Sequence, residues 1–140
     1  MSLDSLEELL DRLVDLMVDA EYTQNYYPMD IEKRGAYNQD KLFNVYLEEL
    51  GEDPESPANA RDWFAIFKIL VIRVTGRSNA TLKAINIEMK EILKTLSDPT
   101  EGDFDSSHIQ MIPPATMHGE PLSTNAMFYE IQVQHHYREE

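Results

Sequence analysis

With 140 residues, 42% of them hydrophobic and 27% charged, the chain has the size and composition of one globular domain, not of a disordered or membrane protein. Twelve basic and 26 acidic residues give a formal charge of −14, which disfavours nucleic-acid binding through a basic face. The chain has no cysteine, which excludes disulfides, thiolate zinc sites and cysteine nucleophiles.

Two features of the sequence predict a protein that stays inside the cell and does not span a membrane. The first eight residues are acidic, whereas a secretory signal carries basic residues followed by an unbroken apolar run. The longest apolar stretch, Trp63–Val74, is interrupted by Lys68 and Arg73. It is also shorter than the roughly 20 residues that a membrane-spanning helix needs, so we expect no transmembrane segment.

The amino-terminal part combines a predicted helix with a connector rich in tyrosine. Leucines at steps of three and four predict an amphipathic helix over Leu3–Glu21. Glu21–Asp40 loses this period and holds four of the seven tyrosines, which predicts a long loop. Because tyrosine is common in both cores and interfaces, the loop is either a lid on the core or a docking surface. The candidate contact residues in it are Tyr26, Tyr27 and Tyr37.

The middle of the chain predicts two strands separated by an acidic loop. Alternation over Leu42–Leu47 favours a strand, although Phe43, Leu47 and Leu50 would also share one face of a helix. Residues 51–57 combine proline, glycine and acids, which predicts an exposed loop. Trp63–Thr75 is apolar on both alternating sets, as expected of a central strand covered on two sides.

A second helix and two more strands complete the predicted fold. Ser78 and Asn79 are suitable caps for an amphipathic helix over Ala80–Leu96. We predict a short strand over His108–Ile112, ended by the adjacent prolines 113 and 114, and a half-buried closing strand over Met127–Gln134. The expected architecture is therefore a single α+β domain over residues 1–140, with a mostly antiparallel four-stranded sheet packed against two helices in the order α-ββ-α-ββ.

The sequence contains none of the compact catalytic or phosphate-binding motifs. His135 and His136 are adjacent, which on a strand directs them to opposite faces and favours a surface pair over a zinc site. Asp103 and Asp105 resemble the start of a calcium loop but lack the distal glutamate, so we interpret them as solvated charge. We therefore expect no cofactor, no metal and no enzymatic activity.

The second proline-rich region offers candidate contacts with a partner. Met111, Met117 and Met127 surround the turn predicted at Pro113 and Pro114. Methionine fills gaps in cores and also adapts to partner surfaces, and the predicted loop position favours partner contacts. The candidate interaction residues in this region are Met111, Met117 and His118.

Nearly the whole chain resembles the tail terminator proteins of long-tailed bacteriophages. The resemblance is strongest from the strand end Val71–Arg77 through the second predicted helix, and in the closing strand Phe128–Gln134. The tyrosine-rich connector and the acidic loop at 51–57 depart from the family pattern. The resemblance carries no catalytic signature, and it assigns no interface residue.

The resemblance implies a virion protein without enzymatic activity. Proteins of this family are α/β subunits that close into hexameric rings, stop growth of the tail tube and join it to the head connector. The expected partners are thus further copies of the chain, the tail tube protein and the connector or stopper protein. DNA would pass through the ring without specific binding, and the surplus of acids would keep it from adhering.

The charge also supports a second hypothesis from a different class of protein. A net charge of −14 and exposed carboxylate loops suit an acidic binding or inhibitor protein, such as an immunity or antidefence factor. Capture of a basic enzyme would favour this alternative, whereas ring formation on tail tubes would favour the tail terminator.

Overall fold

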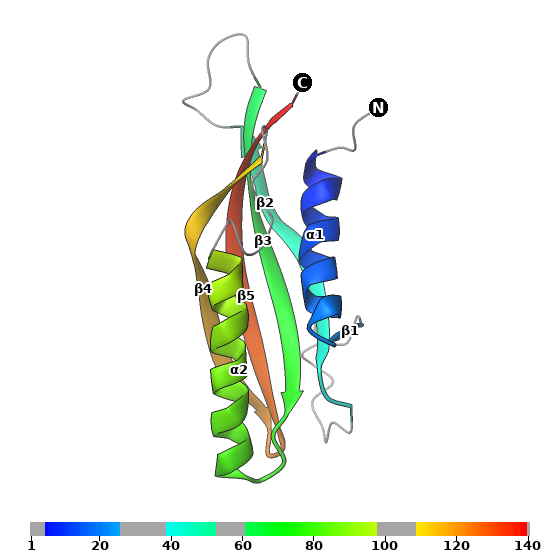
Figure 1. Cartoon of the computed structure of the whole chain (residues 1–140), viewed down its shortest axis with the longest axis vertical. Coiled ribbons are helices and arrows are strands. Elements are labelled where there is room, and N and C mark those ends of the chain that lie inside the picture. The colour runs from blue at the N-terminus through cyan, green and yellow to red at the C-terminus, as the bar shows by residue number, and fades with distance from the viewer. Residues whose placement is uncertain (1–4, 26–38, 53–60, 98–108, 140) are drawn as a thin grey trace.

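The computed structural model describes residues 5–25, 39–52, 61–97 and 109–139, where two helices lie over one face of a five-stranded sheet (Figure 1). This arrangement confirms the prediction of an α+β fold with two helices. Its elements, in chain order, are α1 (Ser5–Asp19), β1 (Thr23–Gln24), β2 (Leu42–Glu52), β3 (Arg61–Val74), α2 (Asn79–Ser97), β4 (Ile109–Ser123) and β5 (Ala126–Glu139).

The strands are ordered β1-β2-β3-β5-β4 across the sheet. The pairs β2–β3 and β4–β5, which follow each other along the chain, are antiparallel, as expected for strands joined by short connections. The pair β3–β5 is also antiparallel, although α2 and β4 lie between these strands in the sequence. The two-residue strand β1 pairs parallel with β2, through Thr23 opposite Leu42 and Gln24 opposite Phe43. The prediction of four strands was therefore one strand short, because two residues are too few to show an alternating pattern.

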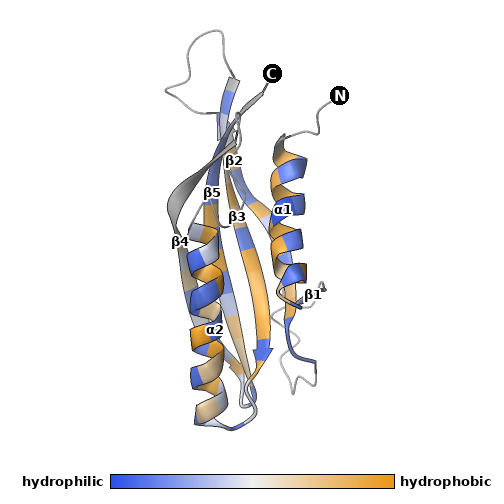
Figure 2. Cartoon of the chain, in the orientation of Figure 1, coloured by the Kyte–Doolittle hydropathy of each residue, from blue (hydrophilic) through white to orange (hydrophobic). Residues whose placement is uncertain are grey.

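The main core lies between the sheet and the helices. Alternate residues of β3, such as Phe67, Ile69 and Val71, face the helices and are fully buried. Leu13 of α1 and Met89 of α2 belong to the same buried cluster and contribute to it from the helices. Figure 2 shows β3 as a mainly hydrophobic stretch between two helices whose ribbons alternate hydrophobic and hydrophilic residues. Neither described helix is long and apolar enough to cross a membrane.

The second face of the sheet has a buried apolar cluster at one end and charged residues in its middle. A smaller cluster includes Leu42, Leu70 and Ile72 near the end of β3. Farther along, Lys68 lies 3.5 Å from Glu48 and 3.3 Å from Glu130. Burial acts to lower the pKa of Lys68, but hydrogen bonding to Glu130 and both carboxylate charges outweigh it, so the net pKa is raised. The prediction of a central strand with apolar cover on both faces thus holds only near its end.

Three predicted strands were too short, and one of them is β5, which runs to Glu139 and not to Gln134. Strand β2 continues to Glu52 past a register shift between Leu47 and Glu49, which decides against the helical alternative for this segment. Strand β4 does not end at the adjacent prolines but runs to Ser123, with another register shift between Ile112 and Thr116. Because β4 is an edge strand and the prolines fall inside this irregularity, their missing N–H groups cost no ladder hydrogen bond.

Candidate functional site

Arg73 near the end of β3 organises a buried polar cluster on the helix-covered face. Its side chain is 5% exposed, and its Nε donates to Oδ1 of Asp40 at 3.1 Å. Its Nη1 donates to the Tyr22 hydroxyl at 2.8 Å and lies 3.2 Å from Oε2 of Glu88 on α2. We call Tyr22, Asp40, Arg73 and Glu88 the arginine cluster. It connects the segment after α1, the segment before β2, the end of β3 and the middle of α2.

A left-handed residue at the end of α1 delivers Tyr22 to the arginine cluster. Glu21 has φ of 70°, and its N–H donates to the carbonyl of Val18 at 2.9 Å. The N–H of Tyr22 donates to the carbonyl of Met17 at 3.0 Å, which completes the Schellman pattern of a helix C-terminus. This turn reverses the chain, so the Tyr22 ring packs back into the core beside Met17.

A second left-handed residue lies on the other side of the arginine cluster. Lys41 has φ of 58°, and its carbonyl accepts the N–H of Thr23 at 2.8 Å. Its ammonium lies 5.5 Å from the centre of the Tyr22 ring, and the Arg73 guanidinium lies at the same distance. Asp40, which precedes Lys41, also accepts the N–H of Val74 at 2.7 Å. One carboxylate thus binds both the Arg73 side chain and the backbone of β3.

The charges of the arginine cluster favour structure over chemistry. Burial raises the pKa of Tyr22 from 10.0 to about 12, with Arg73 opposing this and Glu88 reinforcing it. Burial acts to lower the pKa of Arg73, but Tyr22, Asp40 and Glu88 outweigh it and raise the net value. The phenol therefore stays protonated at neutral pH, and the guanidinium stays charged. Neither group is poised to accept or release a proton, so we interpret the cluster as a clamp between elements.

In the sequence, Arg73 is only a break in an apolar run, and the pattern does not predict the arginine cluster. A lone arginine in a strand with apolar neighbours was nevertheless a usable signal, because a buried guanidinium requires carboxylate or hydroxyl partners. Nothing in the sequence indicates which residues these partners are, because Asp40 and Tyr22 belong to a segment that the sequence predicts as loop.

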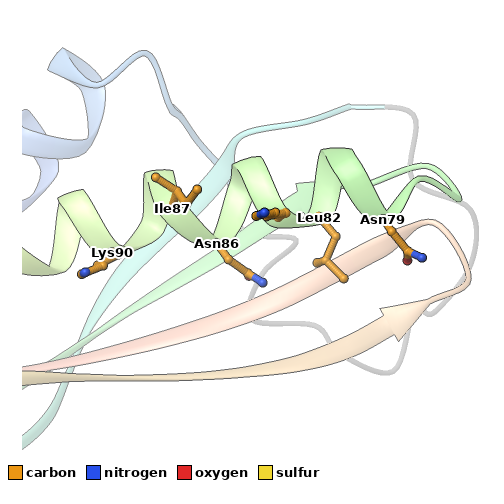
Figure 3. Close-up of a pocket in the computed structure, with 6 residues that line it drawn as sticks. Asn79, Leu82, Asn86, Ile87 and Lys90 are labelled. Atoms are coloured by element: carbon orange, nitrogen blue, oxygen red, sulfur yellow. The ribbon is translucent and has the colours of Figure 1, made fainter.

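The outer face of α2 carries a shallow hollow. Figure 3 shows Leu82 directed toward the strands and Ile87 directed away from them. Oδ1 of Asn86 accepts the Tyr129 hydroxyl at 2.6 Å, which ties α2 to β5, and burial raises the pKa of Tyr129, so the phenol stays the donor. The residues that line the hollow are Asn79, Leu82, Lys83, Asn86, Ile87 and Lys90.

The exposed faces of the two helices have opposite charge. We call the exposed residues Lys83, Ile87, Lys90 and Lys94 the basic stripe of α2. We call the exposed residues Glu7, Asp11, Asp15 and Val18 the acidic stripe of α1. Each stripe lies opposite the buried side of its helix, because its members are spaced three or four residues apart. The basic stripe is thus a local cationic surface on a chain of net charge −14.

The structure does not gather the candidate interaction residues into one site. Tyr26, Tyr27 and Tyr37 lie outside the described residues. Met111 lies within β4 opposite His135, not in a loop, and Met117 packs against the main core. His118 is exposed on the other face of β4, opposite Glu130. The loop that favoured partner contacts is therefore strand in this region, and the interface role of these residues stays a prediction.

The two adjacent histidines lie on opposite faces of β5, as predicted. His135 is fully buried and its ring packs edge-on against Phe67 at 6.0 Å, so the interpretation as a surface pair was wrong for this residue. His136 lies 3.3 Å from the Gln134 amide on the polar face. Within the described residues, no three histidine, aspartate or glutamate side chains converge on a possible metal position. The acids at 101, 103 and 105 lie outside the described residues.

Comparison of the chain with models of protein families found no match, and comparison with curated proteins found no similar sequence.

Proposed function

We propose that the chain is a tail terminator of a long-tailed bacteriophage, a virion protein without enzymatic activity. The observation that carries the proposal is the order helix, strand pair, helix, strand pair, with both helices on one face of the sheet. Apart from the short strand β1, it is the element order on which the resemblance in the sequence rests. In the proposed assembly, residues 1–140 form one domain, whose four antiparallel strands and two helices build one subunit of a hexameric ring in the tail neck.

The distribution of charge supports passage of DNA through such a ring. The chain has 26 acids against 12 basic residues. A channel bordered by carboxylates repels phosphates and lets DNA slide without adhering. The proposed partners are neighbouring copies, the tail tube protein and the head connector. The subunits are made in the host cytoplasm and enter the virion during tail completion.

Purified protein added to tail tubes that were assembled without a terminator tests the proposal. Electron microscopy should show a ring at one tube end, and the tubes should stop growing when tube protein is added later. An unrelated small protein of similar net charge is the control for nonspecific capping. Tubes that stay open and keep growing, together with a monomeric mass in solution, would contradict the proposal.

The acidic stripe of α1 supports a second candidate function, an acidic binding or inhibitor protein. Three carboxylates on one exposed helix face, Glu7, Asp11 and Asp15, can contact a basic enzyme and accelerate its capture. Pull-down from host lysate tests this with the wild-type chain and with D11K/D15K. Retention of a basic enzyme by wild type, and its loss with the variant, would favour the inhibitor over the tail terminator.

A further inference from the structure

The two helices are placed so that one copy of the chain can complement another. Helix α1 contacts β1 and β2, whereas α2 contacts β4 at the opposite edge of the sheet. The helices lie side by side over the same face and run in opposite directions (Figure 1). The helix-covered face therefore presents an acidic stripe over one edge and a basic stripe over the other.

Each stripe carries an exposed aliphatic side chain among its charges. Val18 is 50% exposed and Ile87 is 56% exposed, and the large hydrophobic residues exposed in the described chain are these two and Leu50. Two of the three thus lie on the outer faces of the two helices. An apolar centre surrounded by charge is the usual composition of a protein contact surface.

The two stripes also match in length and spacing. Glu7 to Val18 and Lys83 to Lys94 each span eleven residue steps, about 17 Å at 1.5 Å per residue. The steps from Asp11 to Asp15 to Val18 are four and three residues, and those from Lys94 back to Lys90 and Ile87 are the same. Antiparallel helices therefore bring two pairs of opposite charges and the two aliphatic side chains together in one register. The ion pair of Lys94 with Glu91 at 3.7 Å is largely exposed and is easily exchanged for a partner carboxylate.

We propose that two copies of the chain associate through their helix-covered faces, with the acidic stripe of each α1 against the basic stripe of the other copy's α2. A two-fold axis parallel to the helices exchanges the two edges of the sheet and keeps the helix directions. This axis therefore places each α1 antiparallel to the partner's α2. Both copies use the same surface, so the α1–α2 contact occurs twice in the dimer. The proposal is independent of the tail terminator function, and it leaves the second face of the sheet and the strand edges free.

Sedimentation equilibrium at about 0.15 M salt tests the pairing, because a Debye length of about 8 Å screens the long-range repulsion but not direct contacts. Wild type should approach twice its mass of 16.2 kDa with rising concentration. The variants K83E/K90E and D11K/D15K should each stay monomeric, with dissociation constants at least about tenfold higher. Circular dichroism shows whether each variant keeps the fold.

Mixing the two variants distinguishes this contact from any other. K83E/K90E has two acidic helix faces and D11K/D15K has two basic ones, so an equimolar mixture should form a one-to-one dimer. E49K/E120K changes the charge as D11K/D15K does, but on exposed residues of the second face of the sheet, and it should pair like wild type. A wild type that is monomeric at every concentration, or that captures only a different acidic partner, would overturn the proposal. Variants that still self-associate as strongly as wild type would overturn it equally.

Discussion

Arg73 illustrates how one charged residue can determine the interior of a small domain. Removing a guanidinium from water is costly, and the gain from its partners depends on good geometry with all of them. Here the side chain is 5% exposed, whereas Asp40 and Glu88 are each 41% exposed. The acids thus keep part of their hydration while they neutralise the arginine. This is a favourable arrangement for a buried charge near the end of a central strand.

Truncation of Arg73 should therefore destabilise the fold. Arg73→Ala removes the cation that Asp40 and Glu88 share, leaves Glu88 paired with Lys41 at 3.5 Å, and opens space beside Tyr22. Breaking a buried ion pair costs about 3–5 kcal/mol, and the partial hydration of the two acids reduces this to about 2–3 kcal/mol. Urea denaturation measures the loss. Arg77→Ala is the matched control, since Arg77 is exposed in the turn before α2, and a loss as large there would contradict this explanation.

Tyr22 should make the fold sensitive to alkaline pH. Its pKa is about 12 in the folded chain and 10.0 as the ordinary value, so the folded state retains a proton that the unfolded state releases. The contribution of this proton to the free energy of unfolding is fully present below pH 10. It is lost as the pH rises toward 12, which lowers the free energy of unfolding by roughly 2–3 kcal/mol. Urea denaturation between pH 9 and about 12 measures it. Tyr22→Phe should show a shallower decline, and identical declines would exclude Tyr22 as the cause.

At the residue scale, the sequence predicts which side chains are unusual but not which of them meet. Arg73 was visible as a charge within an apolar strand, while its partners Tyr22 and Asp40 come from segments 51 and 33 residues away. Such contacts depend on the tertiary path of the chain. The same limit applies to His135. Because it is adjacent to His136, the sequence predicts that the two side chains lie on opposite faces, but it does not predict that His135 is fully buried.

At the scale of elements, the C-terminus of α1 offers a direct test of backbone strain. Glu21 has φ of 70°, a conformation that costs most residues about 1–2 kcal/mol and glycine very little. Glu21→Gly should raise the free energy of unfolding by up to about 1 kcal/mol, because the greater freedom of glycine in the unfolded chain offsets part of the gain. Asp19→Gly, at the last residue of α1, should instead lower it by roughly 0.3 kcal/mol. Stabilisation by both changes would contradict the strain argument.

The start of α2 offers a matched test of helix capping. The Ser78 hydroxyl accepts the N–H of Thr81 at 3.2 Å, which is the expected N-cap contact. Ser78→Ala should cost about 1 kcal/mol in thermal or urea unfolding, and Ser78→Asp should restore it through the same contact. An unaffected Ser78→Ala variant would show that the hydrogen bond contributes little.

The elements themselves were predictable in proportion to the length of their pattern. Helix α2 was predicted at Ala80–Leu96 and observed at Asn79–Ser97, because six apolar residues recur along it at helical spacing. Strand β4 was predicted too short, since adjacent prolines usually end a strand and only an edge position with a register shift accommodates them. Strand β1 exists through its pairing with β2 and has no local signal of its own.

At the scale of the whole molecule, self-repulsion among the acids should make stability depend on salt. With a net charge of −14, compact folding brings like charges together, and added salt screens them. The midpoint of urea denaturation should therefore rise between about 0.01 M and 0.15 M sodium chloride. E49K/E52K reduces the net charge by four units and should show a smaller rise. A midpoint that falls with salt in wild type would indicate that ion pairs outweigh the repulsion.

The strand order β1-β2-β3-β5-β4 has a consequence for synthesis of the chain. Strand β3 pairs with β2 on one side and with β5 on the other. Phe67 of β3 therefore cannot pair with Val133 of β5 until the last part of the chain has been synthesised. Until β5 leaves the ribosome, a long apolar strand has one open edge, and such edges recruit other chains. Translation rate and chaperone capture over residues 75–125 should therefore control the yield of soluble protein, and nascent chains stalled in this interval should be the ones that aggregate.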